Sequence, residues 1–92
     1  MKIGYARVST TDQNLDRQIE ALKKVGAEKI FEEKMSGKSM ADREELQNAL
    51  GFLREKDVLI VESLDRLGRN YDDIVQMVQR LDRKEIGLIV LN

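Results

Sequence analysis

The chain of 92 residues contains no cysteine, no histidine and no proline. Without cysteine and histidine it can form no disulfide, Cys/His zinc site, cysteine nucleophile or Ser-His-Asp triad. It also has no excess of one charge, since 16 Lys and Arg stand against 17 Asp and Glu for a net charge of -1. An autonomous DNA-binding module usually carries a basic surplus. If the partner is a nucleic acid, most of the affinity must come from elsewhere.

The sequence also lacks long apolar runs. No run approaches the length of a membrane span, and the segment after Met1 has no signal-peptide core. We therefore expect no membrane association, and the missing cysteines fit a reducing, cytoplasmic environment. The length allows one small domain, or part of one, with a single core.

Short apolar segments alternate with amphipathic ones along the chain. Strands are predicted at residues 3–8, 29–32, 58–61 and 88–91, the last two as continuous apolar runs of buried strands. Helical spacing predicts three helices, the first of which ends near Gly26. Their apolar positions are Leu15, Ile19 and Leu22, then Leu46, Ala49, Leu50 and Leu53, then Ile74, Val78 and Leu81.

The segments between these elements carry further signals. Residues 34–40 have no periodicity and are predicted to form a loop. Asp42 is a candidate N-cap of the second helix, with Glu45 as its capping-box partner. Asp72 and Asp73 fall in the first turn of the third helix, where negative charge is favourable.

The order β-α-β-α-β-α-β indicates an α/β fold, with a mainly parallel four-stranded sheet and helices on both faces. Ligands of such sheets bind beyond the carboxyl ends of the strands. Ser9, residues 36–37 and residues 65–69 each follow a predicted strand, so we expect them to meet at one edge. Asn92 directly follows the last strand, and we expect the chain to be a fragment of a longer protein.

Serine, arginine and aspartate at this edge suit chemistry on a phosphate ester. A serine hydroxyl needs activation, and arginine can neutralise charge that grows on phosphate oxygens. Arg7 and Ser9 are two residues apart, so a strand would point both the same way, about 6.6 Å apart. Arg66 and Arg69 are three apart, which suits one helical or turn face, and Asp65 could orient a guanidinium or pass a proton.

Each of these residues also has a purely structural interpretation. Ser9 or Thr10 could cap the first helix, and Thr10 with Gln13 fits a capping box. Asp65 and its neighbouring arginines could form surface ion pairs of little energetic weight. Residues 36–39 lack the spacing of a phosphate-binding Walker motif. Several carboxylates could in principle bind Mg²⁺, but no ligand spacing recommends them: Asp57, Glu62 and Asp65.

Taken in order, the motifs resemble the catalytic domain of the serine recombinases, the resolvases and DNA invertases. The resemblance covers essentially the whole chain and implies a resolvase-like fold with a flavodoxin-like strand order. The matching segments are Tyr5-Ala6-Arg7-Val8-Ser9, Asp12-Gln13-Asn14, Gln18, Ser36-Gly37, Asp42-Arg43 and Leu64-Asp65-Arg66-Leu67-Gly68-Arg69. The first and last of these blocks, at this separation, are highly specific.

The resemblance implies a mechanism. Ser9 would attack a DNA phosphodiester to form a 5′-phosphoserine link and free a 3′-hydroxyl. Four arginines would bind and activate the phosphate: Arg7, Arg43, Arg66 and Arg69. Gln13 and Gln18 would support the site, and Asp65 would organise the arginines or assist proton transfer. The family needs no cofactor, neither ATP nor a metal. Its partner is double-stranded DNA, bound as a homodimer and recombined in a tetramer, in bacteria, phages or mobile elements.

The resemblance also suggests what lies outside residues 1–92. The family continues into a further part of the catalytic domain, a long dimerisation helix and a helix-turn-helix domain, so we expect an incomplete catalytic domain that is inactive alone. Without DNA, we expect Arg66 and Arg69 to be dispersed or paired with carboxylates such as Asp65 instead of focused on Ser9.

Three alternative functions are considered. They are a serine transposase of the same superfamily, an α/β phosphatase, and a non-catalytic interaction module that keeps the fold.

Overall fold

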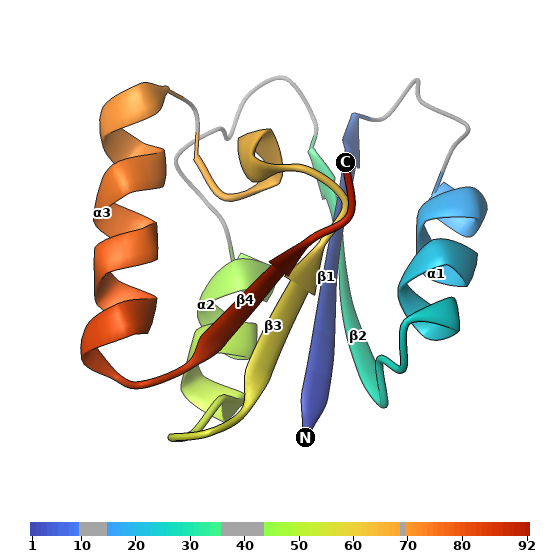
Figure 1. Ribbon diagram of the computed structural model, residues 1–92. Coiled ribbons are helices and arrows are strands. Elements are labelled where there is room, and N and C mark those ends of the chain that lie inside the picture. Colours follow the sequence, from blue (N-terminus) through green and yellow to red (C-terminus); the bar gives the residue numbers. More distant parts are fainter. Residues whose placement is uncertain (10–14, 36–43, 69) are drawn as a thin grey trace.

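The computed structural model describes residues 1–9, 15–35, 44–68 and 70–92, apart from the side chains of residues 8, 9, 34 and 35. Within these ranges strands and helices alternate as the sequence predicts (Figure 1). No helix in these ranges is both long and apolar enough to cross a membrane. The elements are β1 (Lys2–Ser9), α1 (Leu15–Lys24), β2 (Lys29–Met35), α2 (Glu44–Phe52), β3 (Val58–Val61), the 3-10 turn η1 (Leu64–Arg66), α3 (Tyr71–Arg83) and β4 (Gly87–Val90).

The strands form one parallel sheet in the order β2-β1-β3-β4, which is the flavodoxin-like order predicted from the sequence. β1 is central and pairs with β2 and β3 over different lengths. Pairing with β3 ends at Tyr5 opposite Val61, whereas pairing with β2 continues to Ser9 opposite Met35. The last four residues of β1 therefore belong to a two-stranded ribbon that extends past β3.

Helices cover both faces of the sheet, as predicted (Figure 1). Alternate residues of β1 face opposite ways, so Tyr5 packs with α2 and α3 while Ala6 packs with α1. The helical positions Leu46, Ala49, Leu50, Leu53 and Leu81 are all buried on the first face, and Leu22 is buried on the second. The predicted spacing thus identified most of the core.

Gly26 ends α1, as the sequence predicts. Its φ of 97° lies in the left-handed region, which glycine adopts without steric cost. The amide of Gly26 donates to the Lys23 carbonyl at 3.0 Å, and the amide of Ala27 donates to the Leu22 carbonyl at 3.1 Å. These two bonds form the Schellman motif that satisfies the last carbonyls of a helix. The turn then leads directly into β2.

A buried carboxylate connects β1, β2 and α2. Glu33 is 6% exposed. The Tyr5 hydroxyl donates to its Oε1 at 2.6 Å, and the backbone amide of Glu45 donates to its Oε2 at 3.1 Å. The carboxylate therefore accepts from an amide in the first turn of α2, which has no partner inside the helix. The sequence had suggested Asp42 for this capping role, but Asp42 lies outside the described residues.

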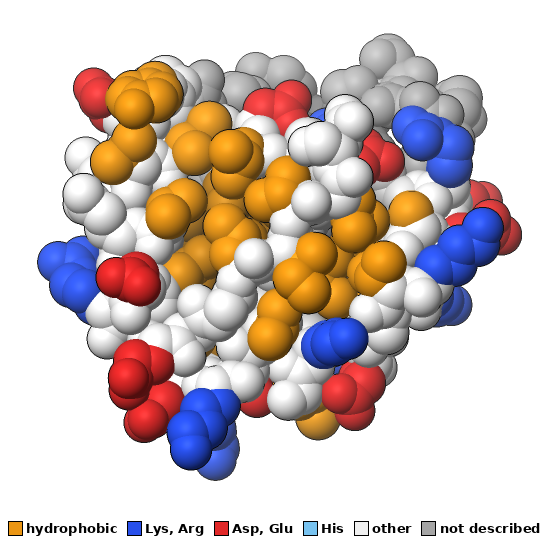
Figure 2. Space-filling model, viewed as in Figure 1, with side chains coloured by type: hydrophobic (Ala, Val, Ile, Leu, Met, Phe, Trp, Pro, Cys, Tyr) orange, Lys and Arg blue, Asp and Glu red, His pale blue; other side chains and the backbone are white. Residues whose placement is uncertain are grey.

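Three sequence predictions need correction. Lys34 and Met35 belong to β2 instead of a loop, because β1 extends far enough to pair with them. Val78 was predicted in the core but is 38% exposed, and Met77 packs against the core from α3 instead. β4 was predicted to be buried but is half-exposed, because it is an edge strand with β3 as its one neighbour in the described sheet. Figure 2, viewed as Figure 1, shows apolar side chains gathered around the strands between α3 and α1.

Candidate active site

The carboxyl ends of all four strands point to one edge of the sheet (Figure 1). At this edge β1 and β3 are neighbours, yet the chain leaves β1 across the face covered by α1 and enters β3 from the face covered by α2. Such a change of direction opens a crevice at the strand ends, where ligands of α/β proteins bind. η1 follows β3 directly into this position and contacts β1.

Arg7 makes hydrogen bonds to two other elements at this edge. Its Nη2 donates to the backbone carbonyl of Asp65 in η1 at 2.7 Å. Its own carbonyl accepts from Nε2 of Gln18 in α1 at 3.3 Å. Gln18 is only 1% exposed, which is unusual for a glutamine on a surface helix. The structure thus brings together three residues that the sequence predicted for the site, from three different elements.

Asp65 contributes in a different way from the one expected. Its side-chain carboxylate accepts a hydrogen bond from the Ser63 hydroxyl. Its backbone carbonyl, not its carboxylate, holds the Arg7 guanidinium. In the described ranges we find no ion pair between Asp65 and an arginine, so the orientation of a guanidinium by this carboxylate is not seen. The Asp65 backbone therefore contacts Arg7, and the role of the Asp65 carboxylate toward the other arginines stays a prediction.

Arg66 is paired with a carboxylate that the sequence analysis had considered only as a candidate metal ligand. Its Nη2 lies 3.2 Å from Oε1 of Glu62, four residues earlier, and the two side chains are 22% and 16% exposed. The second carboxylate oxygen of Glu62 lies 3.7 Å from Nη1 of Arg17 in α1. This agrees with the expectation that Arg66 is neutralised by a carboxylate without DNA, although the carboxylate is Glu62 instead of Asp65.

Two buried polar atoms at this edge have no hydrogen-bond partner among the described residues. They are Oε1 of Gln18 and Nε of Arg66. Leaving a buried polar group unsatisfied costs about 1–3 kcal/mol, so native proteins seldom tolerate it without a reason. An unpaired guanidinium N–H is a donor that an anion can accept from. The unused Nε–H of Arg66 is therefore suited to a negatively charged ligand, whereas the Gln18 oxygen can only accept a hydrogen bond.

The remaining predicted residues are placed only in part. Ser9 is the last residue of β1 and pairs in register with Met35, so its backbone lies at the expected edge. Its side chain is not described. Gln13, Arg43 and Arg69 lie outside the described residues, as does the proposed Thr10–Gln13 capping box. Their approach to Ser9 stays a prediction.

Gly68 allows the segment after η1 to pack against α3. A Cβ atom at this position would lie 2.7 Å from the backbone nitrogen of Ile74 and 2.7 Å from the Cβ of Asp73. Both atoms belong to the first turn of α3, which is fixed by the hydrogen bond from the Asp73 amide to Oδ1 of Asn70 at 2.9 Å. A side chain at residue 68 would therefore displace either this turn or the segment that carries Arg66.

Replacing Gly68 with alanine is expected to lower the free energy of unfolding by about 1–3 kcal/mol, the usual cost of overpacking. Gly51 offers a matched control, because it lies at an exposed position of α2 with no atom within 4 Å of an added Cβ. Gly51→Ala should raise stability by roughly 0.5–1 kcal/mol. Urea unfolding of both variants measures the contrast. Equal effects of the two changes would contradict the close packing at Gly68.

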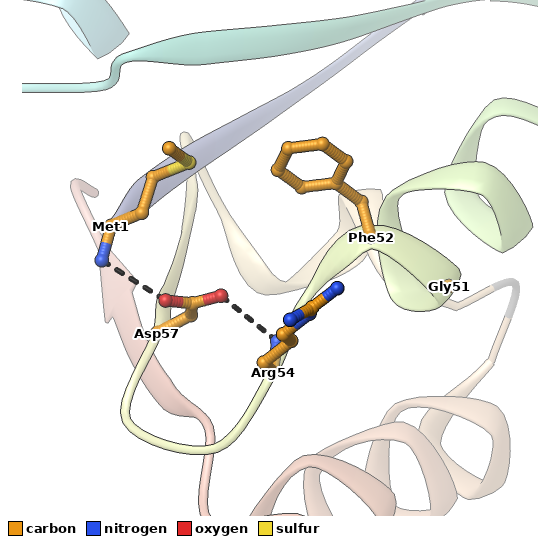
Figure 3. A pocket seen from close by; sticks show the side chains of 5 residues that line it. All are labelled: Met1, Gly51, Phe52, Arg54 and Asp57. Atoms are coloured by element: carbon orange, nitrogen blue, oxygen red, sulfur yellow. Dashed lines mark hydrogen bonds and ion pairs between the residues drawn. The ribbon is translucent and has the colours of Figure 1, made fainter.

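The opposite edge of the sheet carries a hollow of about 410 Å³ lined by Met1, Gly51, Phe52, Arg54 and Asp57 (Figure 3). The Asp57 carboxylate accepts from the Arg54 backbone amide at 2.9 Å and pairs with the terminal ammonium of Met1 at 3.0 Å. These two hydrogen bonds lower the pKa of Asp57 below its ordinary value of 3.8. The bond from the Arg54 amide has the larger effect, and the bond from the Met1 ammonium comes second. These contacts link loops at the amino ends of β1 and β3, away from Arg7.

The carboxylates that could have bound Mg²⁺ are not brought together. Asp57 lies at the amino edge of the sheet, whereas Glu62 and Asp65 lie at the carboxyl edge and bind Arg66 and Ser63 respectively. Among the described residues there is no group of three acidic side chains that could hold a metal ion. The charged groups that do converge at the carboxyl edge include two guanidinium groups, from Arg7 and Arg66.

Comparison with known proteins identifies the class to which this fold and site belong. Residues 2–92 match the family model "Resolvase, N terminal domain". The chain belongs to this family.

Curated relatives agree with this assignment. The chain is 46% identical to the Transposon Tn552 resolvase of Staphylococcus aureus, 45% identical to the Transposon Tn552 DNA-invertase BinR of the same organism, and 48% identical to the serine recombinase gin of Escherichia phage Mu. Each match covers 87 residues, or 95% of this chain, but only 44% or 45% of the relative. The chain thus spans less than half the length of these proteins.

Proposed function

We propose that this chain is the catalytic part of a longer site-specific serine recombinase that cleaves and rejoins double-stranded DNA. The observation that carries the proposal is the convergence of Arg7, Gln18 and Arg66 on the carboxyl edge where β1 ends in Ser9. Family membership supports it, as do the names of the relatives, which include a resolvase, a DNA-invertase and a serine recombinase.

In the proposed reaction the Ser9 hydroxyl attacks the scissile phosphorus. A bond forms between the serine oxygen and phosphorus, the bond from phosphorus to the 3′-oxygen breaks, and the serine proton is lost as the 3′-oxygen gains one. Arginines stabilise the charge that develops on the phosphate oxygens. Arg7 and Arg66 are the described candidates, and Arg43 and Arg69 are expected to join them. Reversal of the same steps reseals the strand without ATP.

Gln18 and Asp65 have supporting roles in this proposal. Gln18 holds the Arg7 backbone from α1, and Asp65 holds its guanidinium from η1. Gln13 is expected to support the site beside Ser9. Proton transfer by the Asp65 carboxylate stays open, since the Ser63 hydroxyl binds it when DNA is absent.

The proposed partners are a DNA recombination site and further copies of the recombinase, two on each site and four in the synaptic complex. With a net charge of -1, residues 1–92 carry no basic surplus to bind DNA tightly. Specific binding then requires a helix-turn-helix domain beyond residues 1–92, positioned through a dimerisation helix. We place the protein in the cytoplasm of a bacterium, where DNA of transposons and phages is accessible.

Two other functions fit less well. A phosphatase on this fold would usually rely on a Cys, Asp or metal nucleophile, and no cysteine is present. A non-catalytic interaction module would have no need for an unsatisfied guanidinium N–H of Arg66 at the edge where β1 ends in Ser9. A serine transposase would share the chemistry and differ in the DNA product.

The direct test is to trap the covalent intermediate. The full-length protein is incubated with DNA that carries its recombination site and a nick that prevents resealing. We expect a covalent protein–DNA adduct whose linked peptide contains Ser9, identified by mass spectrometry after nuclease and protease digestion. An adduct at another residue, or released inorganic phosphate without an adduct, would contradict the proposal.

A further inference from the structure

We propose that Glu62 is a positioning residue that orients Arg66 for phosphate binding. The inference rests on the proposed function, because it assigns a role within the same site. The two neighbouring carboxylates have different partners. The Asp65 carboxylate binds Ser63, whereas the Glu62 carboxylate binds the guanidinium of Arg66. The pairing residue therefore lies just before the recognised motif of residues 64–69, at the end of β3.

The geometry of the pair leaves donors of Arg66 available. A guanidinium has five N–H groups in a rigid plane. In the described contacts Nη2 of Arg66 is used by Glu62, at 3.2 Å, while its Nε is buried without a partner. Fixing one nitrogen of a planar group restricts the direction of the others. Glu62 can thus set the guanidinium plane while other N–H groups remain for a phosphate.

A second arginine stabilises the carboxylate in this role. Glu62 is 16% exposed, and its other oxygen lies 3.7 Å from Arg17 on α1. The carboxylate is partly shielded from water, and two arginines, one of them the largely exposed Arg17, lie close enough to compensate its charge. The set of Arg17, Glu62 and Arg66 keeps a net charge of +1. It therefore connects α1, β3 and η1 without cancelling the attraction for DNA.

This arrangement predicts opposite effects of Glu62 on two steps. A carboxylate beside the phosphate site opposes DNA binding, because it repels the phosphate. The same carboxylate favours the chemical step, because it holds a transition-state donor in place. By analogy with residues that orient metal ligands, its loss is expected to cost about 10- to 100-fold in activity. A residue that only stabilised the fold would lower both together.

The test uses full-length recombinase on nicked recombination-site DNA. Glu62→Gln is nearly isosteric and removes the charge. At saturating DNA we expect covalent adduct to form on the order of 10-fold more slowly, with DNA affinity unchanged or tighter. Glu62→Asp should recover part of the rate. The matched control is Glu55→Gln, an exposed carboxylate in the turn before β3, which should behave as wild type.

A double-mutant cycle identifies the route of the effect. If Glu62 acts through Arg66, Glu62→Gln should slow an Arg66→Ala protein no further. An unchanged or faster single-variant rate overturns the inference, and so does a rate loss of the same size in the Arg66→Ala background. If wild-type protein forms no adduct at Ser9, the proposed function itself fails, which is a distinct result.

The contact can also be examined in the 92-residue chain without DNA. We expect the Arg66 Nε–Hε resonance in ¹⁵N-edited NMR spectra to shift in Glu62→Gln and to stay unchanged in Glu55→Gln. Backbone amide spectra report whether each variant is folded. An unmoved Arg66 resonance in a folded Glu62→Gln protein would overturn the inference independently of any activity.

Discussion

Replacing Ser9 with alanine is expected to abolish DNA strand cleavage by the full-length recombinase. The chain has no cysteine and no histidine, so no neighbouring group of those types can substitute as the nucleophile. Loss of a catalytic nucleophile typically costs on the order of a million-fold in rate. The measurement is adduct formation and strand cleavage on nicked recombination-site DNA.

The same variant should bind recombination-site DNA almost as tightly as wild type. Most of the affinity is proposed to come from outside residues 1–92, and removal of one hydroxyl changes no charge. Gel-shift titration at a fixed salt concentration checks this expectation. Cleavage that survives the change would show that Ser9 is not the nucleophile. Loss of both cleavage and binding would point to unfolding, which circular dichroism detects.

Replacing Arg66 with alanine is expected to lower the cleavage rate by about 100- to 1000-fold, the usual cost of losing one donor aimed at a transition-state charge. Arg66 also carries the buried Nε that has no partner in the described part of the chain. Arg66→Lys keeps the charge but not the planar set of donors, so it should restore little. Single-turnover cleavage at saturating DNA measures the chemical step.

Arg54 provides the matched control for this loss of charge. It is exposed beside the hollow at the opposite edge of the sheet, and the contact to Asp57 comes from its backbone amide, which alanine retains. Arg54→Ala should therefore cleave at the wild-type rate. If both arginine variants lose activity equally, general electrostatic attraction and not a specific contact explains the effect.

Much of the fold could be predicted because it depends on periodicity. Leu46, Ala49, Leu50 and Leu53 follow one helical face, and all four are buried. Val58–Val61 is a continuous apolar run and forms a buried central strand. The errors occur where tertiary context decides. Met77 packs against the core where Val78 was predicted to do so. The elements packed against α3, and not the helical period, decide which residues at the border of its apolar face are covered.

The candidate site could be predicted less completely. The positions of Arg7 and Arg66 could be predicted because topology gathers strand ends at one edge, and Gln18 was expected only from the family resemblance. The role of Glu33 and the contact between Glu62 and Arg17 could not be predicted, since both depend on distances between elements far apart in the sequence. The spacing of Glu62 and Arg66 by four residues was a usable signal, but it is typical of helices and this pair spans the end of a strand and a 3-10 turn.

The unequal pairing of β1 has a consequence for how the nucleophile can move. Residues 3–5 are paired with strands on both sides, whereas residues 6–9 are paired with β2 alone among the described strands. Segments with fewer backbone partners open at a lower free energy than the centre of a sheet. Amide hydrogen exchange should therefore be faster at residues 6–9 than at residues 3–5. Ser9 is therefore expected to lie on a backbone segment that opens more readily than the centre of the sheet.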